Sequence, residues 1–325
     1  MLRNVTRVAV SIVIPTLNRL NMLRQVLASL ERQSTQPKEI IVVDGGSTDG
    51  TVEFVTSLGG RVNYLRQKGW FTSNAKNCGI LKSTGEIVAF LDDDVIPSHN
   101  WLEEIAKTYE LYKTAGGVGG AIIGVTPSKK MSDKLLRVIE GKAHQGIIRV
   151  LSQISRSVFR VNRLLGCNMS FRKSVLERIA YDNDRSWFFD ELYDKTCLGE
   201  DADMCLRVRK NGCTLLLNTE AQVLHLTHKK HLSRKALEYA SFDKLLSQHE
   251  NQTYLLLKCR HYQLAEINLP RIILSRVYLL VLSLLRSVRH PSLKRVFVND
   301  SFAAVMGSKM GYLKFLTHRS LVSTL

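Results

Sequence analysis

Short runs of apolar, often β-branched residues recur along the first hundred positions, and each run ends in a polar turn. Such runs predict strands at Val8–Ile14, Glu39–Val43, Arg61–Leu65 and Ile87–Leu91, and the last of these is apolar on both faces, as in a buried strand. Between them, apolar residues spaced three and four apart predict helices at Leu20–Leu30, Thr51–Leu58 and Asn74–Leu81. Either Asn18 or Asn21 is suited to cap the first helix. Strands alternating with helices predict a mostly parallel α/β sheet.

The pattern is less regular after residue 100. A helix is predicted at Trp101–Lys113, and the glycine-rich run Gly116–Gly124 predicts a strand, because no register fits G-x-G-x-x-G. Residues 127–163 are basic and polar, which suits either a mobile segment over a site or a solvated helix. Order returns with a strand at Gly166–Arg172, a helix that starts near Glu200 and is capped by Gly212, and strands at Thr214–Leu217 and Val223–His228.

Three consecutive carboxylates, Asp92, Asp93 and Asp94, directly follow the strand that ends at Leu91. Like charges this close are unfavourable unless a cation or several donors accompany them. The carboxyl ends of parallel strands are also where open α/β sheets bind ligands. Oxygen ligands of this kind suit Mg²⁺ or Mn²⁺ carrying a substrate's phosphates. The alternative is an acidic turn that caps the helix beginning after Pro97.

Charge separates the end of the chain from the rest. The 325 residues carry a net charge of +17, and the last hundred residues hold 16 Lys and Arg against 5 Asp and Glu. The run 272–285 is apolar except for Ser275, Arg276, Tyr278 and Ser283, and it is flanked by Arg271 and Arg286. It is shorter than the roughly 20 residues that span a bilayer. It suits either an interfacial membrane helix or a helix packed against the core or a dimer partner.

Six cysteines show no metal-finger spacing and predict small buried apolar side chains in a reducing compartment. No secretory signal is recognisable at the start. We therefore expect a cytoplasmic location, either free or peripheral on the inner membrane face. The basic region shows no aromatic–basic RNA signature, so we expect an anionic membrane as its partner and no nucleic acid.

Six motifs occur in an order that resembles the family 2 inverting glycosyltransferases with the GT-A fold. They are Val10–Arg19, Glu39–Thr51, Asn74–Gly79, Asp92–Asp94, Gly166–Arg172 and Glu200-Asp201 with its helix. The resemblance implies a GT-A (Rossmann-like) nucleotide-sugar transferase domain over residues 1–230. The remaining residues, 231–325, are expected to form a basic helical extension associated with a membrane.

The resemblance also implies which residues bind the nucleotide-sugar donor. They are Pro15, Thr16, Leu17, Asn18, Asp44, Lys76, Asn77, Asp92, Asp93 and Asn168. Asp44 is expected to accept from an imide N–H of the base, although an Asx turn over Gly45-Gly46 is the alternative. Lys76 is expected near the diphosphate, or else on a solvated helix face. Asn168 is expected to line the sugar or the acceptor.

For the chemistry, the resemblance implies that Asp94, with His225 or His228, holds Mn²⁺ or Mg²⁺ on the diphosphate. Asp201, with Glu200 as the second choice, corresponds to the general base that deprotonates the acceptor hydroxyl. An acidic first helical turn that merely complements the helix dipole is the structural alternative.

The expected function is metal-dependent transfer of a sugar to a glycan or lipid-linked acceptor in polysaccharide biosynthesis. Two other classes remain open: a sugar-phosphate nucleotidyltransferase, which this sequence disfavours because Pro15–Arg19 lacks glycine, and a non-catalytic basic membrane- or nucleic-acid-binding protein.

Overall fold

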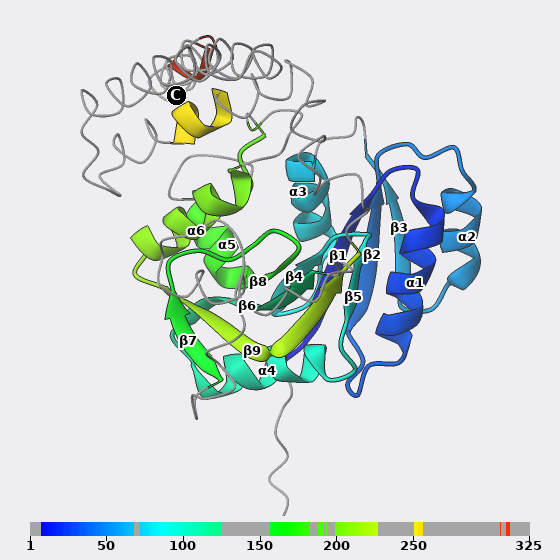
Figure 1. Ribbon diagram of the computed structural model, residues 1–325, viewed down its shortest axis with the longest axis horizontal. Helices are drawn as coiled ribbons and strands as arrows, with labels where there is room; N and C mark the ends of the chain where they lie inside the picture. Colours follow the sequence, from blue (N-terminus) through cyan, green and yellow to red (C-terminus); the bar gives the residue numbers. More distant parts are fainter. Residues whose placement is uncertain are drawn as a thin grey trace, which may run out of the picture. The chain divides into compact units, whose positions relative to one another are not determined.

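The computed structural model describes residues 8–67, 72–124, 157–181, 188–191, 193, 199–226, 250–255, 306 and 310–312 (Figure 1). In that part the strands are β1 (Val10–Thr16), β2 (Glu39–Asp44), β3 (Val62–Arg66), β4 (Ile87–Leu91), β5 (Val95–Pro97), β6 (Ala115–Gly124), β7 (Val158–Val161), β8 (Asn168–Arg172) and β9 (Thr214–His225). The helices are α1 (Leu20–Glu31), α2 (Thr51–Leu58), α3 (Thr72–Lys82), α4 (Trp101–Leu111), α5 (Lys173–Tyr181) and α6 (Glu200–Lys210). Residues 125–156, His228 and the apolar run 272–285 lie outside the described residues.

The chain divides into two compact units. The first comprises Met1–Phe189 and Met204–Thr227, and the second comprises Asp190–Asp203 and His228–Leu325. Helix α6 therefore starts in the second unit and continues in the first. The domain boundary predicted near residue 230 stays a prediction. Among the helices of the described residues, none reaches the length and apolarity needed to cross a bilayer.

The first unit is built on one mixed sheet with the strand order β3-β2-β1-β4-β8-β6-β9-β5, and β7 pairs with β9. Strands β3, β2, β1 and β4 are parallel, as the alternation of strands and helices predicted. Their carboxyl ends therefore lie at the same edge of the sheet. The polar turns after Thr16, Asp44 and Leu91 are neighbours for that reason.

The other half of the sheet carries antiparallel pairings. Strand β8 runs antiparallel to β4, and the short strand β5 runs antiparallel to the end of β9, with Val95 opposite His225. Pro97 lies inside β5, at the last position in the strand order, where an edge strand tolerates its missing N–H. This pairing brings the end of β9 back to the residues that follow β4.

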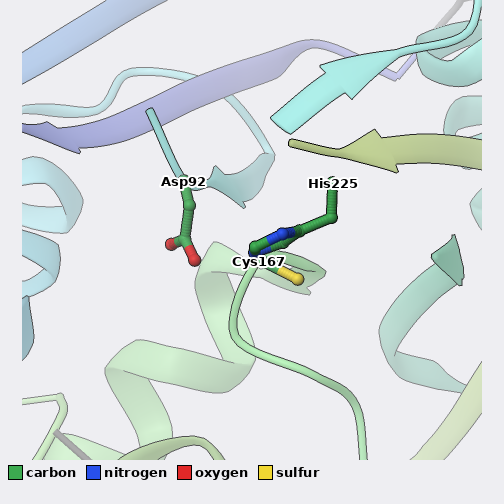
Figure 2. A group of neighbouring side chains, drawn as sticks. All are labelled: Asp92, Cys167 and His225. Carbon is green, nitrogen blue, oxygen red and sulfur yellow. The ribbon is translucent and has the colours of Figure 1, made fainter. Parts of the chain in front are cut away.

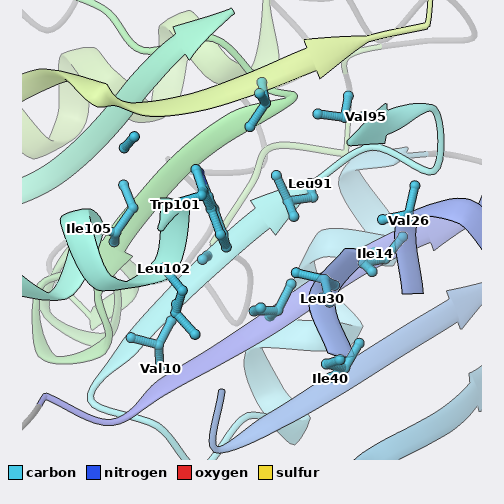
Figure 3. Packing of buried hydrophobic residues seen from close by; sticks show 14 of the residues in the cluster. Val10, Ile14, Val26, Leu30, Ile40, Leu91, Val95, Trp101, Leu102 and Ile105 are labelled. Carbon is cyan, nitrogen blue, oxygen red and sulfur yellow. The ribbon is translucent and has the colours of Figure 1, made fainter. Parts of the chain in front are cut away.

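Two apolar clusters lie on opposite faces of the sheet, which explains why the central strands are apolar throughout. Ile12 and Ala89 belong to one cluster with α1 and α4, and Val13 and Phe90 belong to the other with α3, α5 and part of α6. Figure 3 shows the first cluster, in which Trp101 lies close to Leu91. Because both faces are covered, the sheet edge that carries the polar turns is held by a rigid core.

Gly79 allows α3 to lie close to the sheet. A Cβ at this position would overlap the side chain of Val13, whose Cγ2 would be 2.8 Å away. The close packing fixes the height of α3 above β1. Consequently the buried Lys76 and Asn77, one turn earlier on α3, are held near the polar edge.

Candidate active site

The second carboxylate of the triplet, Asp93, ties β4 to the turn after β1. Thr16 Oγ1 donates to Asp93 Oδ2 at 2.8 Å, and Arg19 Nη1 donates to Asp93 Oδ1 at 3.0 Å. Burial raises the pKa of Asp93 to about 6, although both donors and the Arg19 charge act in the opposite direction. Hydrogen bonds thus fix the position of the Asp93 carboxylate, while burial disfavours its ionised form.

Asp94 contacts nitrogen groups from two distant segments. The same Arg19 Nη1 donates to Asp94 Oδ2 at 3.0 Å, and His225 Nε2 lies 3.6 Å from Asp94 Oδ1. The Leu226 backbone N–H also donates to the Asp94 carbonyl at 2.9 Å, which fixes β9 against the triplet. The triplet does not cap α4, whose N-cap is Asn100, so the acidic-turn alternative is wrong.

Asp92 converges with two side chains from elsewhere in the chain, as Figure 2 shows. A carboxylate oxygen of Asp92, Cys167 Sγ and a ring nitrogen of His225 all lie within 4.8 Å of one another. Burial raises the pKa of Asp92, and the charge of Asp94 adds to this, whereas Lys76, His225 and Arg19 oppose it. Burial, with the charges of Asp92 and Asp94, also raises the pKa of the Cys167 thiol far above its usual value.

The donor set at this point suits a divalent cation. Three carboxylates lie together, and among the described residues Arg19 and Lys76 are the fixed cations whose charges reach Asp92. In addition, His225 Nδ1 is buried and has no hydrogen-bond partner among the described residues. Carboxylate oxygens with an imidazole nitrogen are ordinary ligands for Mn²⁺ and related ions. Asp94 and His225, both predicted as metal ligands, are brought together.

Helix α3 supplies a buried cation and a structural amide. Lys76 is 1% exposed, and its Nζ lies 5.2 Å from the ring centroid of Phe189. Asn77 Nδ2 donates to the Phe189 carbonyl at 2.9 Å, and the Phe189 N–H donates to Asn77 Oδ1 at 2.7 Å. Lys76 is thus not on a solvated face. The Asn77 side-chain amide, by contrast, is hydrogen-bonded at both ends to the Phe189 backbone.

The turns after β1 and β2 are joined by side-chain hydrogen bonds. Asn18 has a positive φ of 52°, and its Oδ1 accepts from the Thr48 N–H at 2.8 Å. Asp49 accepts from the Leu20 N–H at 2.9 Å, so the start of α1 is satisfied from the neighbouring loop. The N-cap of α1 is Arg19, without a side-chain cap bond, and the prediction that Asn18 or Asn21 caps this helix is wrong.

Asp44, at the end of β2, forms the Asx turn that the sequence left open. Its carboxylate accepts from the Ser47 N–H at 3.0 Å and from Ser47 Oγ at 2.5 Å. Tyr64 donates its hydroxyl to Asp44 Oδ2 at 2.9 Å, and burial followed by this bond raises the pKa of Tyr64 to about 12. The base-binding role of Asp44 stays a prediction.

Asn168 holds three elements together inside the first unit. It is 1% exposed, and its Oδ1 accepts from Trp101 Nε1 at 2.9 Å. Its Nδ2 donates to the carbonyls of Ala121 and Ala221 at 3.3 and 3.1 Å. Through these bonds the Asn168 side chain links α4, β6 and β9. Its predicted contact with the donor sugar remains untested.

The start of α6, described by itself, gathers buried carboxylates. Glu200, Asp201 and Asp203 form its acidic first turn and are 5%, 7% and 3% exposed. Asp201 Oδ1 accepts from the Ala202 N–H at 2.7 Å. The sequence predicted a helix that starts near Glu200 and is capped by Gly212, and Gly212 has a φ of +74° just after the end of α6. Carboxylates that only complement a helix dipole are normally solvated, so their burial favours a more specific role.

Two residues of this arrangement were not assigned a role from the sequence. Arg19 closes the first motif, and Cys167 precedes Asn168. For Arg19 the available signal was its position next to the strand-end turn. For Cys167 no local signal was available, because its approach to Asp92 depends on the register of β8 on β4, in which Leu91 is opposite Asn168. His228 lies outside the described residues, so its predicted ligand role is untested.

Comparison with known proteins gives a consistent family signal. The family model described as glycosyl transferase family 2 matches residues 11–179. The validoxylamine A glucosyltransferase of Streptomyces hygroscopicus subsp. limoneus is 26% identical over 236 residues, which cover 68% of this chain and 52% of that protein. An uncharacterized glycosyltransferase of Rickettsia bellii is 37% identical over 103 residues, covering 31% of this chain and 15% of that protein. This chain thus spans at most about half of either relative.

Two further likenesses extend over most of the chain. The glucosyl-dolichyl phosphate glucuronosyltransferase of Haloferax volcanii is 25% identical over 225 residues, 66% of this chain and 68% of that protein. A crystal structure of GalNAc-T7 with UDP, GalNAc and Mn²⁺ aligns with a TM-score of 0.56 at 14% identity, covering 81% of this chain and 52% of that one. The structural likeness shows a shared fold, the GT-A arrangement predicted from the sequence.

Proposed function

Because the chain belongs to glycosyl transferase family 2, whose model matches more than half of it, we propose that it transfers a sugar from a nucleoside-diphosphate donor to an acceptor hydroxyl with inversion at the anomeric carbon. One observation carries the proposal. His225 Nε2 lies 3.6 Å from Asp94 Oδ1 at the carboxyl end of β4, where the strand turns gather. This convergence of residues far apart in sequence supports a diphosphate and metal site there.

The donor is assigned to the edge formed by β1, β2 and β4. The backbone of Pro15–Asn18 and the carboxylate of Asp44 recognise the base. Asp92 or Asp93 accepts from the ribose hydroxyls, and Lys76 offsets charge on the diphosphate. Asp93 is already positioned by Thr16 and Arg19, which supports a placement role for this carboxylate.

Asp94 and His225 are assigned as the residues that hold Mn²⁺ or Mg²⁺. The fit rests on their convergence and on the buried His225 Nδ1, which has no partner among the described residues. When bound, the metal supplies charge neutralisation for the leaving diphosphate. Arg19 contacts both Asp93 and Asp94, so it holds these carboxylates in place when no metal is bound.

The acceptor hydroxyl is assigned to Asp201 as general base, with Glu200 as the second choice. A base must take the proton as the hydroxyl oxygen attacks the anomeric carbon from the face opposite the leaving diphosphate. The burial of Asp201 at the start of a helix supports this role over a surface dipole effect.

The named likenesses suggest where to look for the donor and acceptor. GalNAc-T7 was solved with UDP and Mn²⁺, which makes UDP the first nucleotide to test. The Haloferax volcanii relative is named for a glucosyl-dolichyl phosphate, a lipid-linked sugar. We propose a glycan or lipid-linked acceptor, reached from the cytoplasmic membrane face through the basic residues 231–325. Salt-sensitive sedimentation with anionic vesicles, and none with DNA, tests that placement.

A thermal-shift panel of UDP, GDP, TDP and CDP, each with and without Mn²⁺, tests the donor site. One nucleotide is expected to stabilise the protein only with metal. At about 100 times Kd the gain is about 2.7 kcal/mol, or roughly 5 °C. Asp94→Ala is expected to abolish the metal dependence of the shift, whereas Asp201→Asn keeps the shift and loses turnover.

Glu103→Ala is the matched control, because it removes a carboxylate of α4 that pairs with Lys107 away from the triplet. It is expected to behave as wild type. Metal-dependent stabilisation that survives Asp94→Ala, or near wild-type turnover of Asp201→Asn, would refute the corresponding assignment.

A further inference from the structure

We propose that Asp92, Cys167 and His225 form a binding site for a thiophilic divalent cation, Zn²⁺ or Cd²⁺, and that its occupation excludes the Mn²⁺ or Mg²⁺ expected at Asp94. The site itself stands on the geometry of the three side chains. Only the exclusion of the second metal rests on the proposed function.

The three side chains come from separate parts of the sheet. Asp92 follows β4, Cys167 precedes β8, and His225 ends β9 (Figure 2). Their ligand atoms already lie within 4.8 Å of one another. Bonds of about 2.3 Å to sulfur and about 2.0–2.1 Å to nitrogen or oxygen place tetrahedral ligand atoms roughly 3.3–3.6 Å apart. Moving these atoms closer by at most about 1.5 Å, which side-chain rotation can supply, gives them the spacing of metal ligands.

The donor chemistry separates this set from the one assigned to the diphosphate. A thiolate, an imidazole and one carboxylate are ligands that Zn²⁺ takes in proteins, with a fourth position left for water or phosphate. Mg²⁺ and Mn²⁺ prefer oxygen-rich sites. Cys167 is a free cysteine, and its thiol releases a proton to solvent when the sulfur binds a metal ion.

His225 makes the two sets mutually exclusive. Its Nε2 lies 3.6 Å from Asp94 Oδ1, and its ring also belongs to the group with Asp92 and Cys167. Since Asp92 and Asp94 are two residues apart, two dications at this point would repel each other strongly. Bound Zn²⁺ is therefore expected to prevent Mn²⁺-dependent nucleotide binding.

The binding test uses the full chain in chelator-treated buffer and titrates Cd²⁺, which develops an ultraviolet thiolate-to-metal absorption band. The variants are Cys167→Ser and, as matched control, Cys213→Ser, a partly buried cysteine whose Sγ contacts Arg178. We expect the band in wild type and Cys213→Ser, its loss in Cys167→Ser, and its displacement by Zn²⁺. Absence of the band in wild type, or its persistence in Cys167→Ser at unchanged affinity, overturns the site. Metal-free melting curves of the variants verify that they fold.

A second measurement tests whether bound Zn²⁺ excludes Mn²⁺. Micromolar Zn²⁺ is expected to suppress the Mn²⁺-dependent nucleotide shift in wild type, and Cys167→Ser is expected to need at least tenfold more Zn²⁺. Equal sensitivity of the two proteins overturns exclusion. If no nucleotide gives a Mn²⁺-dependent shift while the Cys167-dependent Cd²⁺ band is present, the proposed function fails and the thiophilic site stands.

Discussion

The ionisation of Asp93 in the candidate site lowers the stability of the folded protein. Its pKa is raised from 3.8 to about 6, chiefly by burial. Because the folded state keeps its proton to higher pH than the unfolded chain does, stability falls as the pH rises from about 4 to about 6. The difference corresponds to about 3 kcal/mol as an order of magnitude. A charge that is retained at this cost is more readily explained by function than by stability.

Replacing that charge should therefore stabilise the metal-free protein at neutral pH. Asp93→Asn keeps an acceptor for Thr16 and removes the ionisation. The difference in unfolding free energy between Asp93→Asn and wild type is expected to shift in favour of the variant by about 1–3 kcal/mol as the pH rises from about 4 to about 7. Urea denaturation with a chelator measures this. Asp49→Asn serves as the control of opposite sign, since hydrogen bonds from Thr51 and Leu20 lower the Asp49 pKa against the effect of burial. A pH-independent difference for Asp93→Asn would show that its ionisation is not opposed by the fold.

Asn168 gives the second residue-scale prediction. Asn168→Ala leaves Trp101 Nε1 and the carbonyls of Ala121 and Ala221 without this partner, in a position that is 1% exposed. Losing these buried bonds is expected to cost about 2–5 kcal/mol of unfolding free energy. Denaturant unfolding measures the loss, and Asn63→Ala on the exposed side of β3 should change stability by less than about 0.5 kcal/mol. A stable Asn168→Ala protein that fails only in donor binding would instead support the sugar contact expected from the sequence.

At the scale of elements, the position of α3 depends on the absence of one side chain. Gly79→Ala would force a Cβ into Val13 and push α3 outward. Overpacking of this kind costs about 1–3 kcal/mol, and it should also weaken nucleotide binding by moving Lys76. The double-mutant cycle with Val13→Ala is the decisive measurement. The double variant is expected to be more stable than the sum of the single changes predicts, whereas additive losses would mean that α3 does not rely on this contact.

The elements differ in how far the sequence could predict them. The strands β1 to β4 and helices α1 to α4 follow from local periodicity and turn residues. The single long strand β9 was predicted as two, and the pairing of β5 with it was not predicted. Pairing between residues 95 and 225 depends on long-range register, which no local pattern records. Cys167 was interpreted as an apolar side chain for the same reason.

At the scale of the whole molecule, the family match ends at residue 179, yet the proposed base lies beyond it. The segment 190–203 belongs to the unit that contains the C-terminal residues. Within that unit, the fully buried Tyr254 donates to Asp190 Oδ2 at 2.7 Å, and its ring centroid is 5.3 Å from that of Tyr193. Tyr193 in turn packs against Gly199, where a Cβ would meet its Cε1 at 2.9 Å. Residues after 230 thus support the start of α6.

Tyr254→Ala should therefore act on Asp201 without touching the triplet. Removing the ring and its hydroxyl is expected to increase amide hydrogen exchange in residues 190–203 by at least tenfold and to lower turnover, while the Mn²⁺-dependent nucleotide shift is kept. Tyr312→Ala, at a tyrosine that is 51% exposed in the same unit, is the matched control and should leave both unchanged. If exchange in 190–203 stays at the wild-type rate in Tyr254→Ala, the C-terminal residues do not order the helix start. The basic residues 231–325 would then serve membrane attachment alone, and the proposed base would be positioned without them.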